Sequence, residues 1–152
     1  MKKILPPLLL ALFLVCGFTA CGSADFLTAG LKIELTGIER MGDGSVHVSW
    51  RVQNPNVFSY LLDKTSHKVS LNGTLVGTLT DNAPLGVPAQ NHAERTGVLT
   101  PAKSDVKAVI DQAVTQGSAA YRLDSALNVL LVEDKFERVA LASSGTVPVT
   151  AK

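Results

Sequence analysis

The sequence has little of what marks several functional classes. Its charges nearly balance, with 14 Lys and Arg against 13 Asp and Glu in 152 residues, a formal net charge of +1. Nucleic-acid-binding surfaces need an excess of basic residues, and base stacking needs aromatic side chains, which make up only 5% of this chain. Two cysteines are too few for a disulfide scaffold or a four-thiolate zinc site. Composition therefore predicts one small folded domain that binds no nucleic acid.

Motifs that carry catalysis are missing as well. The sequence holds no Gly-x-Ser-x-Gly elbow, phosphate-binding loop, dinucleotide fingerprint or His-Glu-x-x-His, the local signatures of common enzyme and metal sites. His47, His67 and His92 are not three or four residues from another His or a Cys. Residues 133–138 mix acidic and basic side chains, which is more typical of a solvated turn than of an acid–base pair. We therefore expect no enzyme activity, no metal and no cofactor.

The N-terminus carries the clearest signal. Lys2 and Lys3 precede an uncharged stretch from residue 4 to residue 20, which ends in small residues. This order is typical of a secretory signal peptide. The stretch is 17 residues long, short for a membrane-spanning helix of about 20 residues, and Pro6-Pro7 disfavours a helix there. A retained membrane anchor stays an alternative.

Residues 18–21, Phe-Thr-Ala-Cys, resemble a bacterial lipobox, with Phe in the position where Leu is usual. The resemblance implies that Cys21 gains a diacylglycerol on its sulfur and becomes the mature N-terminus. Residues 1–20 would then be a lipoprotein signal peptide and residues 21–30 a tether. Attached acyl chains hold a protein stably at a membrane. Gly22, in the place of the Asp that marks inner-membrane retention, implies the periplasmic face of the outer membrane. The alternative is an ordinary buried cysteine near an ordinary cleavage site.

From residue 31 onward the hydrophobic pattern is mostly that of strands. Residues 31–35 and 45–53 alternate apolar and polar side chains, as a strand with one buried face does. Trp50 lies midway along the apolar face of the second segment, so we expect it to anchor the core. Asn72-Gly73 separates two short apolar runs and predicts a hairpin with a type I′ turn. Residues 82–90, with two prolines and a glycine, are expected to form a loop.

One helix is predicted near residues 101–116. Thr100-Pro101 would open it, since proline suits the first helical position, and Gly117 would close it. The apolar residues between them recur at helical spacing. Strand patterns follow at residues 119–131 and 139–149, the latter a single strand or a pair of strands interrupted at residues 143–145 and at Pro148. The fold class is therefore all-β, a sandwich of about seven strands with one helix.

The triplet Asn54-Pro55-Asn56 directly follows the Trp50 strand. Proline cannot donate to a β-ladder and favours an extended residue before it. Asparagine accepts positive φ, and its side chain bonds nearby backbone groups. The triplet is therefore predicted to be a structural turn, with ligand contact as the alternative.

This arrangement resembles the late-embryogenesis-abundant type 2 family, also called the water stress and hypersensitive response (WHy) domain. In that family an alternating strand runs into Asn-Pro-Asn, a hairpin and a helix follow, and the domain ends in a Gly-x-Val-Pro-Val-like segment, here residues 145–149. The resemblance covers residues 31–150. It implies an immunoglobulin-like or fibronectin-III-like β-sandwich and a protective role against water loss without catalysis.

Two functions are consistent with these observations. The first is a non-enzymatic lipoprotein, held at the membrane through Cys21, that protects partly unfolded client proteins or envelope components under desiccation. The second is an envelope binding or adaptor module for a lipid, a polymer or a protein partner, with an exposed sheet edge as one route of binding.

Overall fold

A computed structural model describes residues 28–103, 106–130 and 136–152. The predicted signal peptide, Cys21 and residues 22–27 of the predicted tether lie outside these residues. Among the residues that are described, no helix has both the length and the apolar character needed to cross a bilayer.

The described chain is built almost entirely from strands. The elements in chain order are β1 (Lys32–Arg40), β2 (Val46–Asn54), β3 (Tyr60–Leu71), β4 (Thr74–Asp81), β5 (Leu85–Val87), β6 (Asn91–Val98), β7 (Thr100–Pro101), α1 (Val106–Gln116), β8 (Ser118–Leu130) and β9 (Phe136–Ala151).

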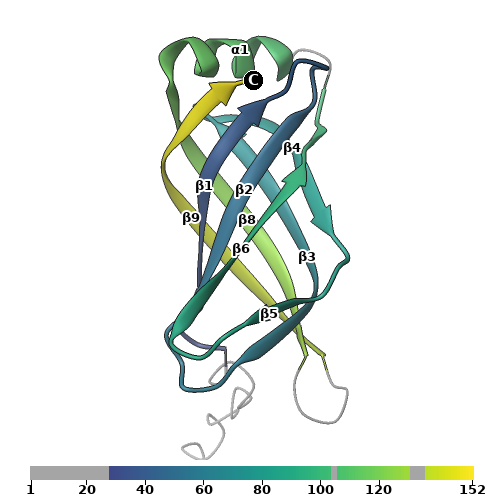
Figure 1. Cartoon of the computed structure of the whole chain (residues 1–152), viewed down its shortest axis with the longest axis vertical. Coiled ribbons are helices and arrows are strands. Elements are labelled where there is room, and N and C mark those ends of the chain that lie inside the picture. Colours follow the sequence, from purple (N-terminus) through teal and green to yellow (C-terminus); the bar gives the residue numbers. More distant parts are fainter. Residues whose placement is uncertain (1–27, 104–105, 131–135) are drawn as a thin grey trace, which may run out of the picture.

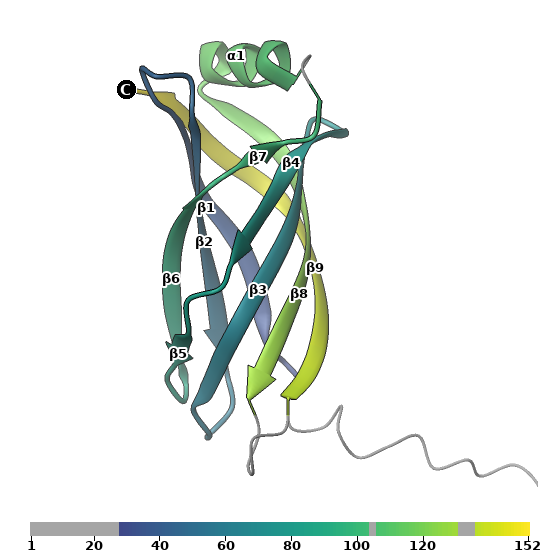
Figure 2. The same cartoon turned by 90° about the vertical axis from the view of Figure 1, so that its right-hand side faces the viewer.

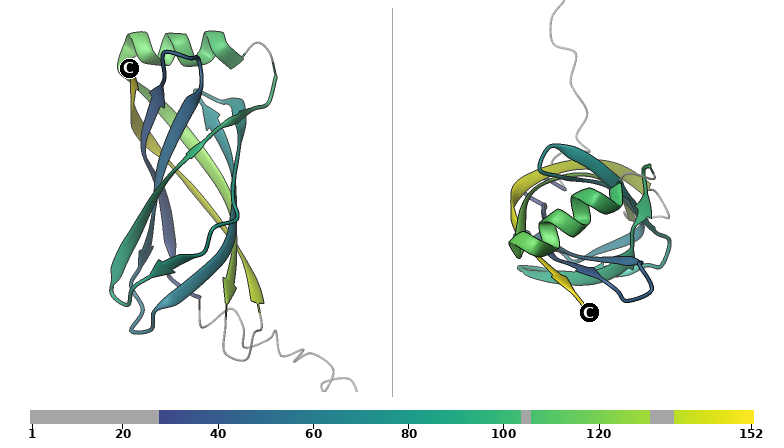
Figure 3. Two further views of the ribbon diagram at one scale, coloured as in Figure 1. Left: turned by 45° about the vertical axis from the view of Figure 1, so that its right-hand side comes forward. Right: turned by 90° about the horizontal axis from the view of Figure 1, so that it is seen from above.

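The strands form one curled sheet whose two halves face each other (Figures 1 and 2). The strand order is β6-β2-β1-β9-β8-β3-β4-β7, with β5 paired to β3. All neighbouring strands are antiparallel except β1 and β9, which pair in parallel over three residues each, 38–40 with 149–151. The 16-residue strand β9 thereby joins both halves. Helix α1 lies across one end of the curl (Figure 3). The predicted all-β, sandwich-like fold is confirmed.

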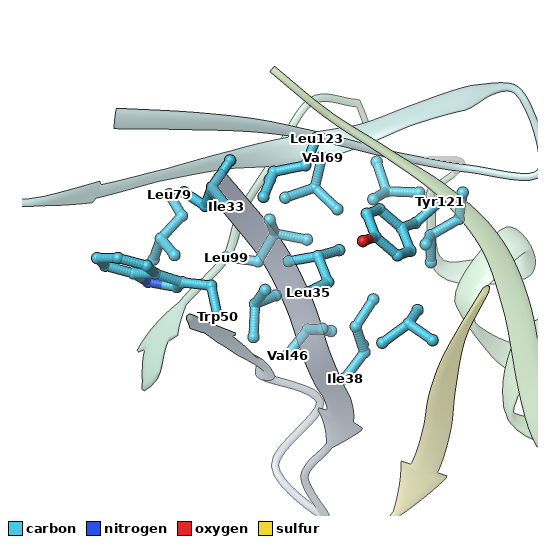
Figure 4. Close-up of a cluster of buried hydrophobic side chains, with 14 of the residues drawn as sticks. Ile33, Leu35, Ile38, Val46, Trp50, Val69, Leu79, Leu99, Tyr121 and Leu123 are labelled. Carbon is cyan, nitrogen blue, oxygen red and sulfur yellow. The ribbon is translucent and has the colours of Figure 1, made fainter. Parts of the chain in front are cut away.

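The core lies between the two halves, and its residues follow strand parity. On β2 every second residue from Val46 to Asn54 is buried, because successive side chains of a strand point to opposite faces. Trp50 is 1% exposed, so the expectation that it anchors the core is confirmed. Figure 4 shows it beside Leu79 and Leu99, at one side of the apolar cluster. The helix closes the core at one end with its buried residues Val106, Ile110 and Ala113.

Two turn predictions are confirmed by backbone geometry. Asn72 and Gly73 have φ values of 48° and 82°, the positive values that a type I′ turn requires at both central residues. They connect β3 to β4. Gly117 has a φ of 72°, and its N–H bonds to the carbonyl of Val114, as expected for a glycine that ends a helix.

The predicted helix start at Thr100-Pro101 is wrong. These two residues form β7, which pairs with Gly77 and Thr78 of β4, and the described helix begins at Val106. Proline suits a strand edge as well as the first helical turn. The local sequence does not distinguish a strand from a helix start here, because the contact that decides between the two is with β4, more than twenty residues earlier.

Two further differences come from long-range pairing. Residues 143–145 do not interrupt the last strand, because Ser144 and Gly145 pair with Arg122 and Tyr121 of β8. Gly145 also lies under the Tyr121 ring, where an added Cβ would be 3.1 Å from Cε1. Strand β6 was not predicted. Its side chains are exposed or half-buried and none is fully buried, so the sequence there has no alternation of apolar and polar residues that would indicate a strand. Within the predicted loop at residues 82–90, three residues form β5.

Candidate functional site

The Asn-Pro-Asn triplet forms a corner where β2 ends. The Asn54 side chain is almost fully buried, at 2% exposure. Its Nδ2 donates to the carbonyl oxygens of Phe58 at 2.7 Å and of Pro88 at 3.0 Å. Its Oδ1 accepts a hydrogen bond from the backbone N–H of Asn56 at 3.0 Å. One side chain therefore holds the end of β2, the β2–β3 turn and the segment after β5 together.

Asn56 connects the same corner to the start of the described chain. Its Nδ2 donates to the carbonyl of Ala29 at 3.0 Å, and its own carbonyl accepts from the N–H of Gln90 at 2.9 Å. Pro55 packs against Gly30, where an added Cβ would lie 3.1 Å from the proline Cγ. The chain thus enters the fold directly beside the triplet.

A hollow of about 430 Å³ opens next to this corner. It is lined by Lys32, Gln53, Asn54, Pro55, Gln90, Asn91 and His92. Groups of three or more His, Cys, Asp or Glu side chains that could hold a metal ion are absent from the described residues. With one histidine and no carboxylate in its lining, the hollow offers polar contacts and no evident acid–base pair.

The three histidines differ in how far they are exposed to solvent. His47 is half-buried and His92 exposed, whereas His67 is 1% exposed. His67 Nδ1 hydrogen-bonds with Ser125 Oγ at 2.8 Å, and Nε2 with Thr65 Oγ1 at 3.1 Å. Burial lowers the pKa of His67 to about 4, although the charge of Asp81 opposes the shift. The ring is therefore neutral at pH 7 and holds the two hydroxyl groups in the interior.

His67 belongs to no local motif, but its position on β3 carries a signal for burial. His67 has the same strand parity as Val69 and Leu71, both of which are fully buried. A polar residue on the apolar face of a strand is expected to find hydrogen-bond partners inside. Its partner Ser125 on β8 lies 58 residues away along the chain, so no local motif could predict this pair.

The polar face of β2 is occupied by charge pairs. Arg51 Nε donates to Glu94 of β6 at 2.6 Å, and Arg51 Nη1 donates to Glu34 of β1 at 3.3 Å. The hydrogen bond and the charge of Glu94 raise the pKa of Arg51 above its usual value. Gln53 Nε2 also donates to Glu34, at 3.1 Å. These contacts cross three strands, and exposed pairs of this kind stabilise a sheet only slightly.

A second hollow, of about 300 Å³, opens between β1 and β9. Its walls include Leu31, residues 32–34 of β1 and residues 141–144 of β9, below the short parallel pairing that joins the two strands. The Oγ of Ser143 is buried there without a hydrogen-bond partner among the described groups. Two strand edges that are not paired with each other face this hollow, so it suits an extended chain better than a compact ligand.

Of the predicted site residues, Asn54, Pro55 and Asn56 come together at one corner, while Cys21 lies outside the described residues. Glu133 and Asp134 of the predicted acidic turn also lie outside them. The described part of that segment, from Phe136, belongs to β9.

The curled mixed sheet with one helix across its end defines an all-β class with a LEA-like fold. The chain is similar to the solution structure of a candidate late embryogenesis abundant (LEA) protein, At2g46140.1, with 12% identity, a TM-score of 0.54, and coverage of 84% of this chain and 76% of that one. It is also similar to the solution structure of AT1g01470 from Arabidopsis thaliana, with 16% identity, a TM-score of 0.52, and coverage of 80% and 79%. No family model and no curated protein sequence matches the chain. At these identities the likeness concerns the fold.

Proposed function

We propose that this chain is a non-enzymatic lipoprotein with a LEA type 2 domain that protects proteins or membranes when water is scarce. The LEA-like fold carries the proposal. In this proposal residues 1–20 are a signal peptide, residues 21–30 a tether, and residues 31–150 the protective domain at the periplasmic face of the outer membrane.

The N-terminal sequence supports the membrane address. Positive charge, an uncharged stretch and small residues before Cys21 are typical of a secretory signal peptide, and the resemblance of residues 18–21 to a lipobox supports lipidation at that cysteine. Acyl chains add about 0.8 kcal/mol of membrane affinity per buried CH₂ group, and two chains give stable attachment.

In this proposal the Asn-Pro-Asn triplet builds the domain and takes no part in a reaction. Three polar contacts of Asn54 go to backbone groups of the chain itself, which leaves the side chain little capacity for a ligand. Protection would instead come from the outer faces of the sheet, which carry polar and charged side chains on alternate positions and can hold hydrogen bonds to dehydrated partners.

The protective function is tested by drying a desiccation-sensitive model enzyme with the purified protein. We expect recovered enzyme activity to exceed that obtained with an equal mass of serum albumin. Recovery equal to that with albumin would overturn the proposal. The Asn54→Asp chain, whose domain is expected to be destabilised, serves as the matched control, because protection should fall with the fraction of folded domain.

Lipid attachment is tested by the intact mass of the protein extracted from membranes. The wild-type chain should lack residues 1–20 and carry a diacylglycerol adduct at Cys21. The Cys21→Ser chain should show neither change, because the thiol that receives the lipid is absent. An unmodified thiol in the wild-type protein would contradict the proposed anchor.

The hollow between β1 and β9 favours a second candidate, an envelope binding module for an extended partner. Strand addition to an unpaired edge uses backbone hydrogen bonds for affinity. A labelled extended peptide that binds the wild-type chain and loses affinity for Ser143→Trp, which fills the hollow, would support this function. Equal binding to both chains would exclude the hollow as the site.

A further inference from the structure

Exposed apolar side chains gather at one end of the molecule. Six large apolar residues are exposed among those described: Val57, Phe58, Leu61, Leu75, Val98 and Phe136. Four of them belong to the end opposite helix α1, which we call the apolar tip: Val57, Phe58, Leu61 and Phe136. Single exposed apolar residues are common on protein surfaces, whereas a cluster marks an interaction site.

Strand register brings the members of the apolar tip together. Leu61 of β3 pairs with Leu130 of β8, and Leu130 pairs with Phe136 of β9. These three side chains therefore form a row across three strands on the outer face. Phe58, which is 63% exposed, lies three residues before Leu61 in the β2–β3 turn. Figure 1 shows this turn and the ends of β8 and β9 at the end of the molecule away from α1.

Hydrogen bonds of the Asn54 and Asn56 side chains fix the turn that carries Val57 and Phe58. The carbonyl of Phe58 accepts a hydrogen bond from the buried Asn54 side chain at 2.7 Å. Asn56, the residue before Val57, is held through its Nδ2 to Ala29. The two apolar side chains are thus presented outward by a turn whose polar groups are already paired internally.

The N-terminal segment joins the fold at this same end. Ala29 contacts Asn56 directly, so the 27 residues that precede Thr28 connect to the fold beside the apolar tip. Those residues include the uncharged stretch from residue 4 to residue 20 and Cys21. A chain anchored in a bilayer through that segment would bring the apolar tip, and not the helix end, toward the lipid.

Charged residues border the apolar tip and limit how deep it can go. Asp63 and Lys64 follow Leu61 on β3, and Arg138 follows Phe136 on β9; all three are exposed. Long basic side chains can place their alkyl stems along apolar surface while the charge stays in water. Charges of both signs at this level are compatible with burial in the interfacial layer and not in the hydrocarbon centre.

We propose that the apolar tip docks into the interfacial layer of the lipid bilayer that holds the N-terminal segment, and so fixes the domain upright with α1 pointing away from the membrane. This inference rests on the proposed membrane attachment. Docking removes the four exposed apolar side chains from water and leaves the rest of the outer surface free for clients.

The test uses the full chain reconstituted in phosphatidylcholine vesicles that contain brominated acyl chains, which quench nearby tryptophan fluorescence. Phe58→Trp places a reporter in the apolar tip. Val98→Trp is the matched control, because Val98 is also exposed, at 56%, and pairs with His47 at the opposite end of β2. The signal of buried Trp50 is measured in the wild-type chain and subtracted from both.

We expect quenching of Trp fluorescence in the Phe58→Trp chain to exceed that in the Val98→Trp chain at least threefold. Equal quenching of the two reporters, or none in either while the protein floats with the vesicles, would overturn the docking. A blue shift of the Phe58→Trp emission that depends on protein concentration and not on lipid would assign the tip to a second copy of the chain, and would also overturn it.

Flotation of the wild-type chain, read together with its intact mass, separates the two proposals. If the chain floats without a lipid adduct at Cys21 and its tip reporter is quenched, lipidation fails as the anchor and docking of the tip stands. If the wild-type chain floats and the reporter is not quenched, the anchor stands and docking fails. If the wild-type chain does not float at all, both proposals fall.

Discussion

The imidazole of His67 lies against the indole of Trp50, with ring centroids 4.5 Å apart and ring planes tilted by 47°. Both residues are 1% exposed, and they come from strands in opposite halves of the curled sheet. The contact therefore joins the two halves across the core. Because the histidine is buried beside an apolar ring, its charged form is disfavoured there.

This burial predicts that stability falls as the pH is lowered. The pKa of His67 is about 4 in the folded chain against an ordinary value of 6.5. Between pH 6.5 and pH 4, His67 binds a proton in the unfolded chain but stays neutral in the folded chain. The free energy of unfolding therefore decreases as the pH is lowered, until the pH reaches about 4. The full loss for this pKa difference is about 3 kcal/mol.

Urea unfolding at pH 7 and at pH 4.5 checks this prediction. We expect His67→Gln to lose most of the pH dependence that the wild-type chain shows in this window, since glutamine does not titrate. His92→Gln is the control and should keep the wild-type dependence, because His92 is exposed. Parallel curves for wild type and His67→Gln would contradict the assignment.

Asn54 is predicted to be the most sensitive residue of the Asn-Pro-Asn corner. Asn54→Ala leaves the carbonyls of Phe58 and Pro88 without their donor, and we expect a loss of about 3 kcal/mol in the free energy of unfolding. Asn54→Asp should be worse, since it points a carboxylate oxygen at two carbonyl oxygens. Asn56→Ala removes one half-exposed donor and should cost about 1 kcal/mol.

Urea titration followed by circular dichroism gives the free energy of unfolding of all three variants. Equal losses for Asn54→Ala and Asn56→Ala would show that burial of Asn54 does not matter.

Trp50 should tolerate one aromatic replacement and not truncation. Trp50→Ala opens a large cavity in the core and is expected to cost about 3–5 kcal/mol. The indole Nε1 is buried without a hydrogen-bond partner among the described groups. Trp50→Phe removes that unpaired N–H along with part of the ring, so its loss should be much smaller than that of the alanine variant. Thermal unfolding followed by circular dichroism measures the difference, and similar losses for the two variants would contradict it.

Two strand glycines should respond differently to alanine. At Gly77 an added Cβ would lie 2.4 Å from the carbonyl oxygen of Thr100, whereas at Gly86 nothing lies within 4 Å. Gly77→Ala must therefore push β7 away from β4, and we expect a loss of about 2 kcal/mol in the free energy of unfolding. Gly86→Ala should change it by less than about 0.5 kcal/mol. A loss for Gly86→Ala as large as that for Gly77→Ala would mean that the close approach of β7 is not what matters.

Local patterns in the sequence were enough to predict several elements of this fold. The alternation around Trp50 predicts which face of β2 is buried, because side chains of a strand alternate without regard to its partners. Asn72-Gly73 predicts the β3–β4 turn, because the required positive φ values depend on those two residues alone. Gly117 predicts the end of the helix for the same reason.

The tertiary structure decided what depends on partners distant in the chain. Thr100 and Pro101 form a strand because β4 offers a free edge, and Ser144 and Gly145 continue β9 because β8 pairs with them. His67 meets Ser125 and Trp50 only when the two halves of the sheet close on each other. The apolar tip likewise unites a turn and two strand ends that are separated by more than seventy residues. Hydrophobic periodicity and turn chemistry depend on a few neighbouring residues, so they can be recognised in the sequence. Strand pairing, the burial of a polar side chain and the grouping of exposed apolar side chains depend on which distant segments become neighbours in the closed fold.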